Sequence, residues 1–251
     1  FCLAAVPALV LLGIACAALG RGHGAIALGY GGSLAAMLLV LLLAGAHLLG
    51  AAPTETQQLP LGLPWVGAHF RLDALSAFML VVVGLGGAAA SLFALGYAAH
   101  DPEAHRVTPF FPAFLAAMLL VALADDAFTF LVGWEAMSLA SWPMVLARHR
   151  EAESRRAGVI YLAMAGFGTL CLLLAFGLLA GPDGAYDFAA IREAGRSPLA
   201  VALALLLVAM GAGSKAGLVP LHVWLPLAHP AAPSHVSALM SGVMTKLALY
   251  A

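Results

Sequence analysis

The sequence has few charged residues and only two lysines. Asp, Glu, Lys and Arg make up 9% of its 251 residues, against roughly 25% in an average soluble protein. The formal net charge of -1 also leaves no basic surface of the kind that binds nucleic acid. These shortages exclude a soluble globular domain and a nucleic-acid-binding protein.

Cysteine is also rare, and its placement excludes two kinds of site. Cys2, Cys16 and Cys171 are far apart, and each lies in an apolar run. This spacing fits neither a disulfide framework nor a thiolate metal site. The sequence likewise shows no phosphate-binding loop, no G-x-S-x-G motif and no haem or zinc spacing. We therefore expect no cofactor and no redox or hydrolytic centre in this chain.

Hydrophobic residues form 63% of the chain and are concentrated in eight long runs. A helix needs about 20 apolar residues to cross roughly 30 Å of hydrocarbon. Runs of this length do not alternate as barrel strands do, and lipid cannot satisfy open backbone groups. The sequence thus predicts an all-α integral membrane protein with about eight transmembrane helices. The runs are 3–19, 25–49, 74–97, 110–124, 128–146, 158–179, 199–219 and 234–251.

The segments between the runs carry the charges that set the orientation. Segment 148–156 holds four arginines, and positively charged loops stay on the cytoplasmic side. This predicts a protein of the cytoplasmic (inner) membrane with an external N-terminus. The proline-rich loop 50–70 and a short surface helix at 186–193 would then be external, the loop forming a structured cap. Asp73 and the turn 125–126 are interpreted as solvated helix caps.

The two lysines, Lys215 and Lys246, both fall within predicted spans. A cation at mid-bilayer costs from about 3 to more than 10 kcal/mol, so such residues usually face a protein interior or a water-filled cavity and serve a function. Desolvation disfavours the charged ammonium and a neighbouring carboxylate favours it, so a small rearrangement could load and unload a proton. Alternatively, Lys215 snorkels to the interface or permanently neutralises a carboxylate.

Helix-weakening residues surround Lys215 in the stretch 211–220, which reads GAGSKAGLVP. We expect this stretch to break the seventh helix. Broken helices at membrane depth recur at ion sites, because their free backbone groups must line a cavity or be covered by protein. A simple proline kink with close packing at glycine is the alternative.

Glu135 is the only carboxylate well inside a predicted span, about 10 Å along the helix from Phe128. Ser138 and Trp142 follow at positions i+3 and i+7, so they share its helix face. An ion pair between Glu135 and Lys215 would offset the desolvation of both charges. The pair would serve equally as a proton switch or as a static link between helices.

Three histidines, His222, His229 and His235, lie between the two lysines. Imidazole donates and accepts a proton near neutral pH, so we include all three in a candidate proton path. His235 and Lys246 are eleven residues apart, about three turns, which predicts one shared helix face. A neighbouring hydroxyl stripe could hold waters or allow close packing; it comprises Ser234, Ser237, Ser241 and Thr245.

These motifs resemble a known family of membrane proteins. Gly133-Trp134-Glu135 and the stretch 213–226, GSKAGLVPLHVWLP, are similar to the antiporter-like proton-translocating subunits of NADH:quinone oxidoreductase, Mrp antiporters and membrane-bound hydrogenases. The continuation 228–244, AHPAAPSHVSALMSGVM, most resembles the hydrogenase branch, of the formate hydrogenlyase and hydrogenase-4 type. Residues 1–100 resemble the family only in their pattern of spans. Leu227 is a departure, because relatives usually carry an acidic residue there.

The resemblance implies a fold of about fourteen helices with two inverted five-helix repeats. This chain, whose ends fall inside apolar runs, would be a fragment holding three N-terminal helices (1–107) and the first repeat, helices 4 to 8 (108–251). Glu135 would be the fifth-helix glutamate, Lys215 the lysine of the broken seventh helix and Lys246 the eighth-helix lysine of the proton path.

The function implied is that of a non-catalytic membrane-arm subunit, which couples redox chemistry in a peripheral arm of partner subunits to the transport of protons or Na⁺. Other membrane subunits of a hydrogenase or of a complex-I-like assembly would be its neighbours in the bilayer. The alternatives are a subunit of respiratory NADH:quinone oxidoreductase or of an Mrp-type Na⁺/H⁺ antiporter, and a structural membrane scaffold.

Overall fold

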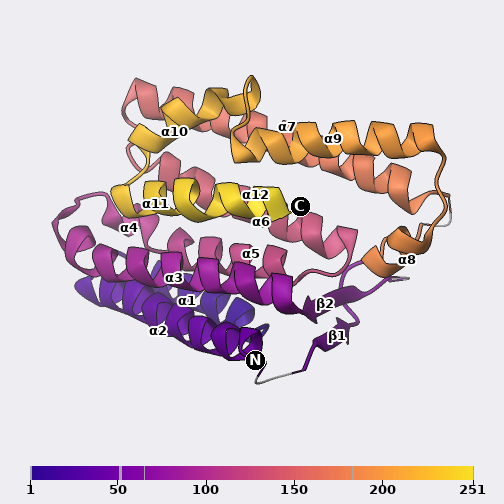
Figure 1. Ribbon diagram of the computed structural model, residues 1–251. Helices are drawn as coiled ribbons and strands as arrows, with labels where there is room; N and C mark the ends of the chain where they lie inside the picture. Colours follow the sequence, from indigo (N-terminus) through magenta and orange to yellow (C-terminus); the bar gives the residue numbers. More distant parts are fainter. Residues whose placement is uncertain (1, 51–52, 65, 183, 251) are drawn as a thin grey trace.

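The computed structural model describes residues 2–50, 53–64, 66–182 and 184–250, which form a bundle of long helices lying side by side (Figure 1). Each predicted span folds as a helix. Within the described residues, five stretches are long and apolar enough to cross a membrane by length and composition: 23–48, 74–100, 104–123, 152–180 and 198–231. The helical membrane class is therefore confirmed. The spans are α1 (Ala5–Leu19), α2 (His23–Leu48), α3 (Ala74–Tyr97), α5 (Phe110–Leu123), α6 (Ala127–Val145), α7 (Ala152–Ala180), α9 (Pro198–Ala216) and a last helix made of α11 (Ser234–Leu239), η3 (Met240–Met244) and α12 (Thr245–Tyr250).

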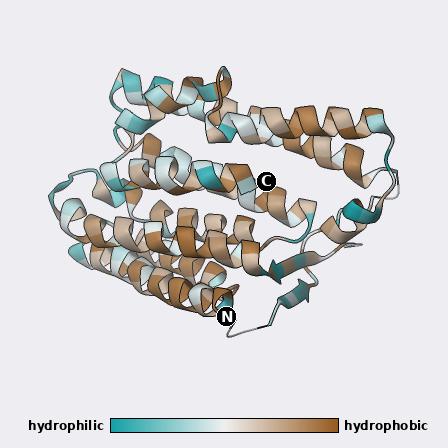
Figure 2. Ribbon diagram, in the orientation of Figure 1, coloured by the Kyte–Doolittle hydropathy of each residue, from teal (hydrophilic) through white to brown (hydrophobic). Residues whose placement is uncertain are grey.

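Hydropathy separates the sides of the bundle from its ends. Apolar residues cover the long helices, and hydrophilic residues gather at the ends of the bundle (Figure 2). Large side chains that would face lipid stay exposed, among them Leu42, Val159 and Leu205. Helix α5 is central: in the stretch 104–123 that contains it, 72% of the apolar window is buried. This is the pattern expected of helices that pack on one another on one side and contact lipid on the other.

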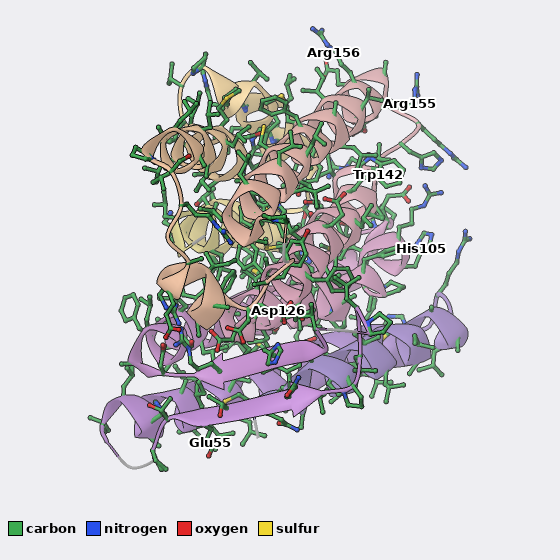
Figure 3. All side chains as sticks on the ribbon, turned by 90° about the vertical axis from the view of Figure 1, so that its right-hand side faces the viewer. Glu55, His105, Asp126, Trp142, Arg155 and Arg156 are labelled. Atoms are coloured by element: carbon green, nitrogen blue, oxygen red, sulfur yellow. The ribbon has the colours of Figure 1, made fainter. Side chains whose placement is uncertain are left out.

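Short elements lie at the two ends of the bundle. At one end are the two strands and α8 (Phe188–Glu193), which confirms the predicted helix near 186–193. At the other end are α4 (Ala104–Val107) and α10 (Leu225–Ala231) (Figure 1). The 3-10 turn η1 (Ala98–His100) connects α3 to α4. Arg155 and Arg156, at the start of α7, project away from the helices (Figure 3).

The loop 50–70 contains a β-hairpin that was not predicted. Strand β1 (Glu55–Leu59) pairs antiparallel with β2 (Ala68–Leu72), with Glu55 opposite Leu72. Phe70 is buried and bridges to Ala124, just beyond α5. The hairpin therefore ties the loop to the helix ends, as the expected cap would.

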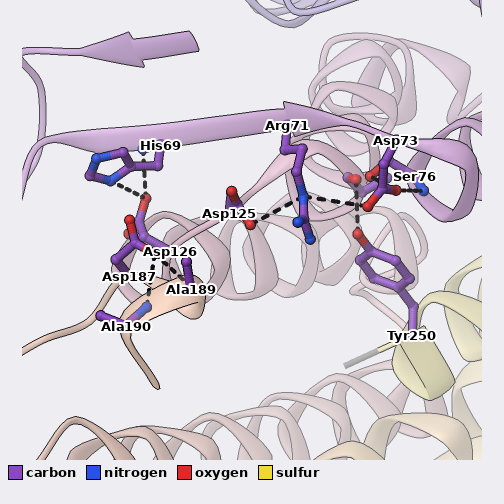
Figure 4. A network of polar contacts seen from close by, with 11 residues as sticks. His69, Arg71, Asp73, Ser76, Asp125, Asp126, Asp187, Ala189, Ala190 and Tyr250 are labelled. Carbon is purple, nitrogen blue, oxygen red and sulfur yellow. Dashed lines mark hydrogen bonds and ion pairs between the residues drawn. The ribbon is translucent and has the colours of Figure 1, made fainter. Parts of the chain in front are cut away.

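A polar network joins this hairpin to the helix starts (Figure 4). The Nε of Arg71 lies 3.4 Å from Asp73 and 3.3 Å from Asp125. Asp126 caps α6 by accepting from the amide of Thr129 at 2.7 Å, and it also accepts from the amide of His69 at 2.8 Å. Asp126 was expected in water, but it is 0% exposed, because the hairpin covers it and supplies a second backbone donor.

Helix α9 is broken as the sequence predicts. It ends at Ala216, and Gly217 has φ +81°, a left-handed conformation that glycine adopts without steric cost. The chain resumes in the 3-10 turn η2 (Leu221–Trp224) and then in α10. The break leaves Lys215 in the last turn of α9, where the adjoining helix surfaces can reach its side chain.

Candidate functional site

Lys215 is held inside the protein by helix α6. Its side chain is 6% exposed. The Nζ donates to the carbonyl oxygen of Trp134 at 3.0 Å and to the Oγ of Ser138 at 2.6 Å, and it lies 4.4 Å from the centroid of the Trp134 ring. An ammonium with two oxygen acceptors and an aromatic face is stabilised where it stands. Lys215 therefore does not snorkel to the membrane surface.

The backbone around the break is satisfied by local contacts. The amide of Leu218 donates to Gly213 O at 2.8 Å. Trp224 folds back from η2, and its Nε1 donates to Ser214 O at 2.7 Å. The Oγ of Ser214 donates to Met164 O in α7 at 3.1 Å. Because the free groups of the broken helix are paired in this way, the break is a stable feature of the site.

Glu135 has a partner other than the expected lysine. The carboxylate accepts from the Oγ1 of Thr169 in α7, at 2.5 Å, and Glu135 is half-buried. Of the ion pairs between described residues, none joins Glu135 to Lys215. The expectation of a direct pair is thus wrong for this conformation: Ser138 and Trp134 take the ammonium, whereas Thr169 takes the carboxylate. We call this arrangement the separated state.

A small cavity lies against Lys215. Its volume of about 10 Å³ is close to the minimum that one water requires. Tyr161, on its wall, makes a 2.6 Å hydrogen bond with Ser141. Ser138, Ser214 and Trp224 also line the cavity. Polar groups from α6, α7 and α9 therefore converge on the point where Lys215 ends.

Of the three histidines, His229 contacts a residue that lines the Lys215 cavity. Its ring stacks on Trp224, with centroids 6.0 Å apart, and its Nδ1 lies 2.9 Å from the Oγ of Ser237. Trp224 in turn borders the Lys215 cavity. His222 is half-buried in η2, and its Nδ1 has no hydrogen-bond partner among the described atoms. Its part in a proton path stays a prediction.

His235 and Lys246 do not share a helix face. His235 is 3% exposed, with its Nε2 3.1 Å from the hydroxyl of Tyr30. Lys246 is exposed and donates to Ser241 O at 2.8 Å and to Thr245 Oγ1 at 3.3 Å. Between them η3 is a π-helical turn, which accommodates one residue more than an α-helical turn and shifts later residues by roughly a quarter turn. The assumption of an unbroken 3.6-residue period was therefore wrong here.

Two residues that contact the candidate site were not found from the sequence. Thr169 and Tyr161 both lie in the long apolar run of α7, where a hydroxyl has no distinguishing neighbour. A weak signal exists for Tyr161, since tyrosine inside a span usually needs a hydrogen-bond partner. In the described part of the chain, no group of three or more His, Cys, Asp or Glu residues is placed to hold a metal ion.

Family models match most of the chain. The model described as "NADH:quinone oxidoreductase/Mrp antiporter, TM" matches residues 124–251. The model described as "NADH-Ubiquinone oxidoreductase (complex I), chain 5 N-terminus" matches residues 62–108. The first match contains Glu135, Lys215 and Lys246, together with the three histidines.

Individual relatives agree with these matches. Hydrogenase-4 component B of Escherichia coli (strain K12) is 43% identical over 182 residues, which are 72% of this chain and 27% of that protein. NADH-quinone oxidoreductase subunit N 1 of Sorangium cellulosum (strain So ce56) is 28% identical over 80% of this chain and 42% of that protein. The solved Mrp complex from Dietzia sp. DQ12-45-1b contains a similar chain, with a TM-score of 0.81 and 28% identity, covering 99% of this chain and 47% of that one. The chain thus spans less than half of each.

Proposed function

Because the chain belongs to the NADH:quinone oxidoreductase/Mrp antiporter family of membrane subunits, we propose that the complete protein is the proton-translocating membrane-arm subunit of a hydrogenase of the formate hydrogenlyase or hydrogenase-4 type. The identity of 43% with a hydrogenase-4 component supports this branch. Partner subunits would carry out the redox chemistry, and this chain would couple it to ion transport without a cofactor of its own.

The buried ammonium of Lys215 at the break of α9 is the observation that carries the proposal. In the separated state it is bound by neutral acceptors, the Trp134 carbonyl and Ser138, while Glu135 is bound by Thr169. A cation held by neutral groups is less stabilised than one beside a carboxylate. Movement between the separated state and a Glu135–Lys215 pair would therefore change how strongly Lys215 holds its proton.

The proposed path continues from Lys215 toward the last helix. Trp224 and the stacked His229 connect the Lys215 cavity to Ser237. Imidazole can exchange its proton in either direction near neutral pH. Lys246, exposed on the last helix beside Ser241 and Thr245, would pass the proton onward to parts of the protein beyond this chain.

The central test is Lys215→Met in the full-length protein, assembled with its partners in sealed vesicles. Methionine keeps the length of the side chain and removes the proton-binding group, so coupled proton uptake should be lost while assembly is intact. Arg150→Met, which removes an exposed cation from the connection before α7, is the matched control and should transport normally. Unchanged uptake in Lys215→Met would reject the proposal.

A cation/proton antiporter is the second candidate, and the 28% identity with a chain of a solved Mrp complex over 99% of this chain supports it. It would use the same buried charges but respond to the cation. Sodium-stimulated proton exchange without any redox donor would establish it. A structural scaffold predicts instead that the neutral double variant Glu135→Gln/Lys215→Met keeps both assembly and transport.

The parent complex can be identified by purification in mild detergent with metal analysis and activity assays. Nickel with hydrogen oxidation would establish the hydrogenase branch, and flavin with NADH oxidation would move the protein to the respiratory enzyme. Absence of both would favour an antiporter.

We also propose that the protein lies in the cytoplasmic membrane with its N-terminus outside. The segment 148–156, rich in arginine, would then face the cytoplasm, and the β-hairpin would face outward. Cysteines placed at Arg150 or at Arg196, in a chain without its native thiols, distinguish the orientations. A membrane-impermeant maleimide applied to intact cells should label position 196 and spare position 150, and the reverse pattern would invert the topology.

A further inference from the structure

Tyr30 brings a hydroxyl from an N-terminal helix to a histidine of the last helix. Tyr30 lies in α2, is 0% exposed, and its hydroxyl is 3.1 Å from the Nε2 of His235. The two residues are 205 positions apart, so the contact forms only when the bundle is folded. A buried polar contact over this separation links the N-terminal helices directly to the candidate path.

Three aromatic rings pack against His235. The centroids of Tyr30, Phe111 and Tyr97 lie 5.3, 5.4 and 5.8 Å from the imidazole centroid. Among the described atoms, the Tyr30 hydroxyl is the hydrogen-bond partner of the ring, and Nδ1 has none. In such an apolar setting one hydrogen bond has a large effect on the orientation of the ring and on its tautomer.

A tyrosine hydroxyl can partner both protonation states of imidazole. It donates to an unprotonated Nε2, and after rotation of its O–H it accepts from a protonated Nε2. Phenylalanine fills the same volume and can do neither. The ring of Tyr97 also packs against His235, but the hydroxyl of Tyr97 makes no hydrogen bond to it within the described structure.

We infer that Tyr30 is a positioning residue for His235, holding the ring in one orientation while its Nε2 gains or loses a proton during transport. This inference rests on the function proposed above. Tyr30 acts through His235 and need not itself exchange protons. It also assigns a role in proton transport to α2, which lies outside both segments that the family models match.

The test compares Tyr30→Phe with Tyr97→Phe in the assembled full-length complex. Both variants remove one hydroxyl from an aromatic ring that touches His235, so they are matched in volume. Tyr30→Phe should lower the rate of coupled proton uptake roughly tenfold, the effect of one hydrogen bond in a buried site. Tyr97→Phe should change it less than about twofold. Equal rates for the two variants would overturn the inference.

A spectroscopic readout separates positioning from a general loss of stability. In ¹⁵N spectra of the histidine-labelled complex, the resonances absent from His235→Gln identify the His235 ring. Tyr30→Phe should shift both nitrogen resonances of that ring and leave the other histidines unchanged, whereas an unshifted ring would contradict the inference. Normal transport by Lys215→Met would refute the proposed function itself. If Lys215→Met is inactive but Tyr30→Phe transports at the wild-type rate, only the role of Tyr30 is refuted.

Discussion

The separated state of Glu135 and Lys215 depends on two hydroxyl groups that can be removed singly. Ser138 accepts from Lys215 Nζ at 2.6 Å, and Thr169 donates to Glu135 at 2.5 Å. Ser138→Ala and Thr169→Val delete these contacts and keep the side-chain volume nearly constant. Each variant removes one neutral hydrogen-bond partner from a charge, and Lys215 keeps only the Trp134 carbonyl in Ser138→Ala, so each should favour the direct Glu135–Lys215 pair.

The expected shift in the equilibrium between the separated state and the Glu135–Lys215 pair follows from the kind of hydrogen bond that is lost. A hydrogen bond to a charged group contributes about 1.5 to 3 kcal/mol, which corresponds to roughly a 10- to 150-fold change in an equilibrium constant. If transport requires passage through the separated state, coupled proton uptake should fall by at least roughly tenfold in either variant. Both variants act on the same equilibrium, so both should slow transport.

The assay is proton uptake by vesicles that contain the assembled complex, driven by its redox partner. Ser91→Ala is the matched control for Ser138→Ala. Ser91 is also buried and donates to a carbonyl four residues back, at 2.6 Å, but it touches neither charge. Its loss should leave transport unchanged. If Ser138→Ala and Thr169→Val transport as fast as Ser91→Ala while Lys215→Met is inactive, the separated state has no role in the cycle.

Three further predictions concern stability. Gly211→Ala should lower the unfolding free energy by about 1 to 3 kcal/mol, because its Cβ would lie 2.8 Å from a backbone oxygen of α7. The control in thermal melting is Gly166→Ala, since an added Cβ at Gly166 has no atom within 4 Å. Trp224→Phe should cost about 1 to 3 kcal/mol by freeing the Ser214 carbonyl at the break, and an unchanged denaturation midpoint would contradict this. Burial raises the pKa of Asp125, so the native protein binds this proton more tightly than the unfolded chain does, and the stabilisation is lost as pH rises above about 4. The melting temperature of Asp125→Asn should therefore rise relative to that of the wild type as the pH is raised from about 4 to about 7. If the difference between the two melting temperatures stays constant over this range, the raised pKa of Asp125 is refuted.

The sequence alone was sufficient to predict the features that local composition controls. Long apolar runs become helices because lipid leaves the backbone no other hydrogen-bond partner. The concentration of glycine, serine and proline around Lys215 predicted the break of α9, since these residues weaken any helix that contains them. Asp73 was recognised as a helix cap, and its side chain accepts from the amide of Ser76 at 2.8 Å.

The β-hairpin of the loop 50–70 was missed because its strands are short and lie among prolines and glycines. Strand β1 is almost wholly exposed and shows no alternating pattern. The pairing depends instead on β2, which buries Ala68 and Phe70 against the end of the bundle. That surface exists only after the helices have packed.

The partners of the buried charges were decided by tertiary structure alone. Composition showed that Lys215 and Glu135 would be buried, and the cost of burial implied that each needs a partner. The choice of Ser138 and Thr169 over a direct ion pair depends on how α6, α7 and α9 pack, which no local pattern encodes. The π-helical turn that separates His235 from Lys246, and the contact that α2 makes with His235 across 205 residues, were hidden for the same reason: sequence periodicity reports which residues are buried, whereas the packed helices determine which atoms meet.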